Sequence, residues 1–253
     1  MKSQIAIKLS HVSKKYTLHH EKPTLVENVI GRQKKEEFWA LKDINLEINK
    51  GDRVGIIGPN VSGKTTLLEI IAKITTPTEG EIVTNGKLVS LIELEAGFHP
   101  ELTGEENIYL NGLLVGMSKE ETNKKLDKII SFADIGQFID APLYTYSEGM
   151  KLRLGFSIVV HTNPDIVLLD ENMAVGDTSF KRKSLKKIQD FVKNKKTLVV
   201  VSHLMDFVAN TCHRVIWLED GSVKEEGNSR ELINKYLNKN YTQFSASSKR
   251  KPF

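Results

Sequence analysis

Hydrophobic and polar positions follow two different periods along the chain, and the changes between them delimit the expected strands and helices. Residues 5–12 alternate as a strand does, and residues 38–48 resume that pattern. Residues 53–57 form a short apolar run typical of a buried strand. The continuous apolar runs 165–170 and 197–202 predict a central parallel strand and a second buried strand.

Helical spacing of apolar residues separates these strands. It predicts helices over 66–73, 105–114, 119–132, 151–161 and 180–194. Ser118 before Glu121 resembles a capping box, and Asn228 with Glu231 predicts the start of a final helix.

Two dipeptides predict hairpin turns. Asn85-Gly86 lies within the alternating segment 81–92, and Asp220-Gly221 lies between two short strands near the end. Strands alternating with helices indicate an α/β fold.

A stretch of roughly residues 17–37 fits no strand and interrupts this order. It contains one narrow apolar helical face, a glycine and a charge run (Leu25, Val29, Ile30, Gly31, and Arg32 to Glu37). We expect an inserted short helix and loop within one domain, residues 1–238. The polar, basic tail 239–253 is expected to be disordered.

Composition narrows the class of protein. The chain has 253 residues, 40% of them hydrophobic, and a formal net charge of +4. Its basic residues are scattered among nearly as many acids, so nothing calls for nucleic acid. No apolar run reaches the ~18 residues that a membrane span needs. The single cysteine, Cys212, excludes an internal disulfide and is expected to be a small buried residue. These features suit a cytosolic protein that reaches a membrane through a partner.

A phosphate-binding loop joins the strand 53–57 to the helix after it. The loop reads Gly58, Pro59, Asn60, Val61, Ser62, Gly63, Lys64, Thr65, Thr66, the pattern G-x-x-x-x-G-K-T. Glycines let successive N–H groups point at phosphate oxygens, and the helix adds its positive dipole end. Lys64 is expected to reach the β- and γ-phosphates, and the Thr65 hydroxyl to meet Mg²⁺. This predicts a nucleoside triphosphatase.

Val61 is the unusual residue of that loop. A β-branched side chain resists positive φ, and many such loops carry glycine there. Whether Val61 only narrows the freedom of the loop or also weakens nucleotide binding stays open.

Like the phosphate-binding loop, two further segments with candidate nucleotide-site residues follow buried strands, and we call each such segment a station. Asp170 and Glu171 end the run 165–170. Asp170 can hold the Mg²⁺ shell near Thr65, and Glu171 can act as general base toward the attacking water. His203 follows the run 197–202, where it can hydrogen-bond the γ-phosphate and the acid that activates water.

A fourth station opens the helix 151–161. Ser147 is a candidate N-cap, Gly149 permits close approach of the backbone, and Glu148 lies between them. A helix start offers N–H groups to an anion, so we expect a second phosphate contact, used by a second subunit.

The order of these motifs resembles that of the ATP-binding subunit of ABC transporters, over roughly residues 5–238. The resemblance implies a P-loop ATPase fold with a mixed sheet core, an antiparallel β subdomain and a helical subdomain at about 104–161. It implies ATP and Mg²⁺ as cofactors, and a homodimer bound to an integral membrane permease. Ser147, Glu148 and Gly149 then belong to the signature, Asp177 to the D-loop, and Tyr16 is the aromatic that stacks on adenine.

A narrower resemblance links the chain to exporters of teichoic acids and O-antigen polysaccharides. It rests on residues 93–112, Tyr146 to Met150, Ala174 to Asp177, Ser202-His203, and the insert before Phe38. It implies a lipid-linked polysaccharide as the transported substrate, and a peripheral position on the cytoplasmic face of the membrane. Only about 15 residues follow the last expected helix, so a short form without an added carbohydrate-binding domain is expected.

Some positions depart from the family pattern. The usual Q-loop glutamine is absent, and either Glu93 or Glu95 occupies its region. Glu148 stands where glycine or serine is commoner. Phe38 or Trp39 could replace Tyr16 at the adenine.

Three other functions are alternatives. An ABC ATPase could serve a different membrane substrate. ATPases of this kind that act on DNA or ribosomes usually need a long coiled coil or a tandem cassette, and neither is present. A small-molecule kinase would explain neither the Ser147 station nor His203.

Overall fold

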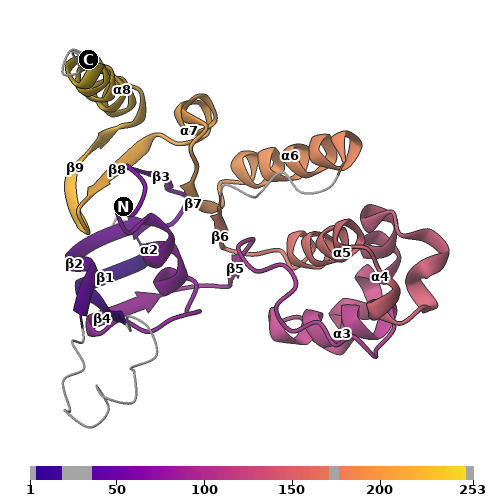
Figure 1. The fold of residues 1–253 in the computed structure, drawn as a ribbon. Helices are drawn as coiled ribbons and strands as arrows, with labels where there is room; N and C mark the ends of the chain where they lie inside the picture. Colours follow the sequence, from indigo (N-terminus) through magenta and orange to yellow (C-terminus); the bar gives the residue numbers. More distant parts are fainter. Residues whose placement is uncertain (1–3, 19–35, 171–176, 249–253) are drawn as a thin grey trace, which may run out of the picture.

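The computed structural model describes residues 4–18, 36–170 and 177–248. Its strands form two sheets (Figure 1). The larger sheet has the order β5 (Leu88–Ser90), β6 (Ile166–Leu169), β7 (Thr197–Val201), β3 (Arg53–Ile57), β8 (Arg214–Glu219) and β9 (Ser222–Asn228). The smaller, antiparallel sheet has the order β2 (Glu36–Asn49), β1 (Ile5–Leu18) and β4 (Glu79–Thr84).

The middle of the larger sheet is parallel, as the continuous apolar runs predict. Strands β5, β6, β7, β3 and β8 run in parallel, and β9 returns antiparallel to β8. In this register Ile56 of β3 lies opposite Val201 of β7, and Leu169 of β6 lies opposite Val200. The carboxyl ends of β6, β7 and β3 therefore meet at one edge of the sheet.

The described chain has seven α-helices. They are α2 (Lys64–Ile71), α3 (Gly104–Leu114), α4 (Lys119–Ala133), α5 (Glu148–Val160), α6 (Thr178–Lys193), α7 (Met205–Thr211) and α8 (Ser229–Ser248). Two short 3₁₀ helices, η1 (Gly136–Asp140) and η2 (Leu143–Thr145), precede α5. In Figure 1, α3, α4 and α5 gather into a helical lobe on the opposite side of the molecule from α2 and the smaller sheet.

Alternate side chains of the central strands enter two different cores, because successive residues of a strand point to opposite faces. Val54 and Ile56 pack with the smaller sheet and α2, whereas Ile57 packs with residues of α5 to α8. The helical lobe has a third core, which includes Ile108, Ile129 and Leu154. The lobe thus has a core of its own, and Phe156 and Val159 of α5 also join it to the core of the sheet.

Helix capping follows the sequence closely. The capping box of Ser118 and Glu121 at the start of α4 is confirmed. Thr103 and Glu106 form a second reciprocal box at α3, which we did not predict. The Asn228 side chain accepts hydrogen bonds from the first turn of α8, as expected.

The hairpin predicted at Asn85-Gly86 is wrong, whereas the one at Asp220-Gly221 is confirmed. Strand β4 pairs with β1, while β5 pairs in parallel with β6 of the other sheet. The Asn85 side chain donates to the Ile5 carbonyl at 3.0 Å, and the Lys87 N–H donates to Asp165 Oδ2 at 2.8 Å. The two sides of the turn are thus held to different sheets, and Gly86, at φ +121°, provides the crossing.

Other boundaries also differ from the expectation. Strand β1 extends to Leu18 and β2 begins at Glu36, so both ends of the segment 17–37 belong to strands. The rest of that expected insert lies outside the described residues. Helix α8 continues to Ser248 and so includes residues 239–248, which we expected to be disordered.

The expectation for the single cysteine is confirmed. Cys212 is 4% exposed, and burial raises the pKa of its thiol to about 12, so it behaves as an apolar core residue. Within the described ranges, every helix is too short or too polar to cross a bilayer.

Candidate active site

The phosphate-binding loop, Asp170 and His203 lie along one edge of the larger sheet. The loop leaves the end of β3, Asp170 follows β6 directly, and His203 follows β7 by two residues. Because β7 lies between β6 and β3, His203 is placed between the acid and the loop. Asp170 is half-buried and His203 is exposed. The structure therefore brings together three stations that are far apart in the sequence.

The lysine of the phosphate-binding loop is hydrogen-bonded to the backbone of the same loop. The Lys64 ammonium donates to the carbonyls of Gly58 at 3.0 Å and Pro59 at 2.8 Å. Gly63 precedes α2 with φ +98°, and a Cβ there would lie 2.5 Å from the Ala40 carbonyl oxygen. Only glycine fits that position, because it combines a left-handed backbone with contact to β2.

The residues of the loop fit a phosphate group. A cavity of about 130 Å³ is lined by the loop together with Phe38 and Ala40. The Ser62 hydroxyl is buried and finds no hydrogen-bond partner among the described residues. The first turn of α2 contains no acidic residue of its own that would compete with a phosphate for its N–H groups and dipole. A buried, unpartnered hydroxyl beside a lysine and a helix start is a donor set suited to phosphate oxygens.

Val61 adopts the positive φ that its branched side chain resists. Its φ is +65°, and 79% of its surface is exposed. A β-branched residue in this region stores strain of about 1–3 kcal/mol. The premise of the sequence argument is therefore met, since the loop does require left-handed backbone at this position.

The aromatic candidates separate onto two faces of the smaller sheet. Tyr16 pairs directly with Phe38 across β1 and β2, and Lys15 pairs with Trp39. Opposite residues of an antiparallel pair share a face, and successive residues do not. The ring of Trp39 lies under the Lys15 ammonium at 5.3 Å, whereas Phe38 lines the cavity of the phosphate-binding loop. Trp39 is thus directed away from the loop, and Tyr16 and Phe38 lie on the side of the cavity.

The two Q-loop candidates also face different neighbours. Burial raises the pKa of the Glu69 carboxyl on α2, and the charges of Glu93 and Asp170 raise it further. Burial raises the pKa of Glu95, and its acidic neighbour is Glu148 at the start of α5. Glu93 therefore lies toward Asp170, and Glu95 lies toward the helical lobe. In the described residues, no cluster of three or more His, Cys, Asp or Glu could hold a metal. Mg²⁺ needs no such cluster, because it usually takes one or two carboxylates and keeps several waters.

The start of α5 is capped as predicted but lies in the helical lobe. The Ser147 hydroxyl accepts a hydrogen bond from the Met150 N–H at 3.2 Å. Among the described residues, a Cβ at Gly149 would meet only the Ser147 hydroxyl, at 3.9 Å, so they leave the space beside this helix start open. Glu148 is exposed and pairs with Lys151 at 3.3 Å. The structure does not bring this station to the phosphate-binding loop of the same chain (Figure 1).

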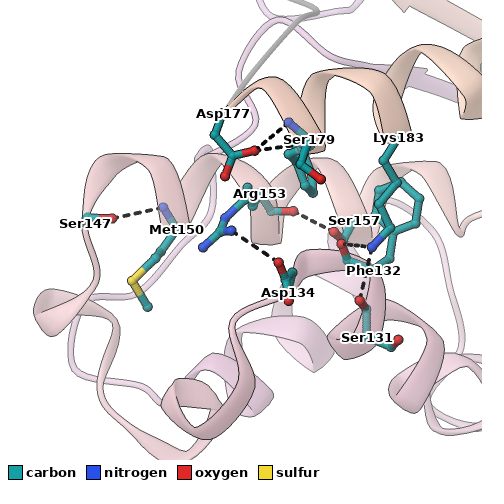
Figure 2. A network of polar contacts seen from close by, with 11 residues as sticks. Ser131, Phe132, Asp134, Ser147, Met150, Arg153, Ser157, Asp177, Ser179 and Lys183 are labelled. Atoms are coloured by element: carbon teal, nitrogen blue, oxygen red, sulfur yellow. Dashed lines mark hydrogen bonds and ion pairs between the residues drawn. The ribbon is translucent and has the colours of Figure 1, made fainter.

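Asp177 caps α6 next to α5. Its carboxylate accepts hydrogen bonds from the N–H groups of Phe180 and Ser179, which lower its pKa. Figure 2 shows this cap beside a set of contacts that join α4, α5 and α6. Arg153 of α5 pairs with Asp134 at 3.8 Å, and Lys183 of α6 donates to the carbonyls of Ser131 and Phe132. These contacts hold the α6 start to the helical lobe. Glu171, the expected general base, lies outside the described residues.

Comparison with known proteins agrees with this geometry. The model of the ABC transporter family matches residues 41–174. The teichoic acids export ATP-binding protein TagH of Listeria innocua is 44% identical over 238 residues, which are 93% of this chain and 71% of the relative. The O-antigen export system ATP-binding protein RfbB of Klebsiella pneumoniae is 40% identical over 237 residues, which are 91% of this chain and 96% of the relative.

The chain belongs to the ABC transporter family. It is an ABC ATPase, and it binds and hydrolyses ATP. A solved dimer of the ATP-binding cassette MJ0796, in a post-hydrolysis state with ADP and Pi, matches it with a TM-score of 0.67 and 28% identity. That match covers 88% of this ABC ATPase and 98% of the cassette.

Sequence reasoning missed one acid of this ABC ATPase. Glu69 lies on α2 near Glu93 and Asp170. The available signal was a lone carboxylate in an otherwise apolar turn, between Leu67-Leu68 and Ile70-Ile71. The pattern marks that face of α2 as something other than core.

Proposed function

We propose that this ABC ATPase drives export of a lipid-linked cell-surface polysaccharide, of the O-antigen or teichoic acid type, across the cytoplasmic membrane. The observation that carries the proposal is the match to two relatives named for such export, one of them over 96% of its own length. The partner would be an integral membrane permease, with the ATPase peripheral on the cytoplasmic face.

Two copies would act together. The Ser147 and Gly149 helix start is open and lies apart from the phosphate-binding loop of its own chain. A second copy can present this helix start to the nucleotide held by the first. The dimeric form of the MJ0796 cassette supports this arrangement.

The site residues divide the roles between them in this proposal. Lys64 and the first N–H groups of α2 would hold the phosphates, and Thr65 and Asp170 would hold Mg²⁺ with its waters. Glu171 would accept the proton of the attacking water, and His203 would hydrogen-bond the γ-phosphate side of the site. When bound, ATP supplies the transferable phosphoryl group, and Mg²⁺ neutralises charge as the group leaves.

Three measurements test this proposal. The Glu171→Gln variant should bind ATP, hydrolyse it slowly and accumulate as an ATP-bound dimer in size-exclusion chromatography. The Lys64→Ala variant should lose ATP binding. In cells that lack the endogenous protein, the wild-type chain should restore surface polysaccharide and copurify with a membrane permease, and neither variant should restore it. Near wild-type turnover of Glu171→Gln would refute its role, and unchanged surface polysaccharide without the protein would favour a different membrane substrate.

A further inference from the structure

A second pocket, of about 600 Å³, lies on the outer side of the molecule. It is formed where α4, the end of α5, α6 and the segment before β7 meet, and its ionisable lining residues are Lys125, Lys128, His161, Lys187, Asp190 and Lys196. The segments around it lead into the amino ends of β6 and β7, whereas the phosphate-binding loop lies at the carboxyl ends. We call it the basic pocket, and it is distinct from the ATP site.

Positive charge in the basic pocket is only partly compensated. Its lining has four lysines and one carboxylate, Asp190, and the carboxylate of Glu121 on α4 lies near Lys125. The carboxyl ends of α5 and α6 add roughly half a negative charge each, so a net charge of about +1 remains. None of the four lysines makes a hydrogen bond or ion pair with another described residue. By contrast, Lys183 of α6 uses its ammonium on two carbonyls of α4.

The lysines come from separate elements and converge. Lys125 and Lys128 lie on α4, Lys187 on α6, and Lys196 on the segment that enters β7. Lys125, Lys187 and Lys196 are half-buried, whereas their neighbours Lys124, Lys186 and Lys195 are exposed. Holding like charges together in a concave, partly buried place is unfavourable unless an anion joins them.

His161 forms part of the wall of this pocket. Its Nδ1 lies 2.7 Å from the Ser157 carbonyl, so Nδ1 carries the proton, and Nε2 is the nitrogen left for a ligand. The ring stacks edge-on against Phe132. Burial lowers the pKa of His161, and the charges of Lys187, Lys125 and Lys128 lower it further. An anion among these lysines would favour the protonated ring, which could then donate from Nε2.

We propose that the basic pocket binds a small polyvalent phosphate, with Lys125, Lys187 and Lys196 as its ligands and His161 as an additional donor. Phosphate is the chemistry that several ammonium groups on separate elements recognise as point charges. The volume suits a small molecule or a lipid headgroup that enters the pocket.

The test uses inorganic pyrophosphate and the full chain in a Lys64→Ala background, so that the phosphate-binding loop does not contribute. Isothermal titration calorimetry should detect binding. The double variant Lys125→Gln/Lys187→Gln should weaken it about tenfold or more, since it removes two charge-assisted hydrogen bonds. The matched control Lys124→Gln/Lys186→Gln changes the same net charge on the same two helices and should alter the affinity less than twofold. Circular dichroism checks that both variants remain folded.

Two further measurements complete the test. Binding should tighten from pH 7.5 to 6 more in the starting protein than in His161→Gln, because the protonated ring can donate to the anion. The other charged groups that face the ring are Lys125, Lys128, Lys187, Lys196 and Asp190, and both proteins share them. Flotation with vesicles of phosphatidylcholine, with and without 20% phosphatidylglycerol, separates the sources of the phosphate. Vesicle binding lost in the pocket variant alone indicates a headgroup, and calorimetric binding without vesicle binding indicates a free ligand. The proposal would be overturned if the starting protein bound neither pyrophosphate in calorimetry nor vesicles in flotation. It would also be overturned if the control variant weakened pyrophosphate binding as much as the pocket variant.

Discussion

Tyr16 and Phe38 lie directly opposite each other on β1 and β2, beside the cavity of the phosphate-binding loop. Their exposed fractions are 37% and 39%, which is high for large aromatic side chains. Exposed aromatic surface next to a phosphate site is what a stacked base would cover. This cross-strand pair narrows the choice of adenine-stacking aromatic, which the sequence left open among three residues.

We predict that Phe38→Ala weakens ATP binding, and that Tyr16→Ala does so too. Loss of an aromatic platform costs about 1–3 kcal/mol, or roughly 5- to 150-fold in affinity. Trp39→Ala is the matched control, because its ring lies on the other face of the sheet under Lys15. Calorimetry with ATP measures all three variants. A larger loss for Trp39→Ala than for Phe38→Ala would show that the assignment of faces does not describe the nucleotide-bound protein.

Val61→Gly should bind ATP at least as tightly as the wild-type chain. The left-handed backbone at φ +65° strains a β-branched residue by about 1–3 kcal/mol, and glycine removes that strain. The exposed side chain has little packing to lose. Calorimetry of the variant gives the answer, with Val61→Ile as the control that keeps the strain. A weaker affinity for Val61→Gly would mean that valine is well fitted to the bound state.

Glu93→Gln should raise the Mg²⁺ concentration needed for half-maximal ATPase activity, whereas Glu95→Gln should not. Glu93 lies toward Asp170 and Glu69, and Glu95 lies toward Glu148. Glu93→Gln should also lower the pKa of the Glu69 carboxyl, because it removes a neighbouring negative charge. Mg²⁺ titrations and NMR titration of Glu69 measure the two effects. If both variants needed the same Mg²⁺ concentration, neither Glu93 nor Glu95 could be assigned the role of the missing Q-loop glutamine.

Two glycines of α5 should respond oppositely to alanine. A Cβ at Gly155 would lie 2.1 Å from the Leu94 carbonyl oxygen, so Gly155→Ala forces α5 away from the segment that carries Glu93 and Glu95. Overpacking of this kind costs about 1–3 kcal/mol. Gly149→Ala meets open space and should keep the melting temperature while it slows hydrolysis, because the second copy would approach there. Thermal unfolding and steady-state ATPase assays test the pair. Normal hydrolysis by Gly149→Ala would argue against contact across a dimer at this position.

Local sequence signals predicted the elements well, because their causes are local. The buried parallel strands, the Ser118 capping box and the Ser147 cap all follow from residues within one turn or strand. The hairpin prediction at Asn85-Gly86 was wrong because the structure of this turn is not determined locally. The choice between a hairpin and a crossing depends on Ile5 and Asp165, each about 80 residues away, which hold the two sides of the turn to different sheets.

The candidate site shows the same division. Its motif residues could be named from the sequence, and their common edge follows from the rule that parallel strands align their carboxyl ends. The face of the sheet on which Phe38 and Trp39 lie depends on the irregular register of β1 and β2 between Lys14 and Lys15, which no periodicity reveals. Glu69 was missed because its neighbours Glu93 and Asp170 come from other elements.

The expected insert joins the ends of β1 and β2 immediately beyond the Tyr16 and Phe38 pair. The ladder continues through Thr17 opposite Glu37 and Leu18 opposite Glu36, and residues 19–35 connect its two strands. We infer that this segment contacts the permease or the lipid-linked substrate, because its basic residues Arg32, Lys34 and Lys35 suit anionic headgroups at about 1 kcal/mol each.

Replacing residues 19–35 with a four-residue Gly-Ser loop should therefore abolish export and leave the ATPase activity of the isolated subunit intact. A short loop can close the ladder, since Leu18 and Glu36 are already paired as the last residues of a hairpin. Because the segment leaves the sheet so close to the aromatic pair, the affinity for ATP is measured in parallel by calorimetry. Reversal of charge at Arg32, Lys34 and Lys35 in the intact chain is the matched variant, and it should reduce export without shortening the connection. Normal export by both variants would show a tolerated surface loop, and loss of ATP binding in the shortened chain would place the segment at the adenine instead.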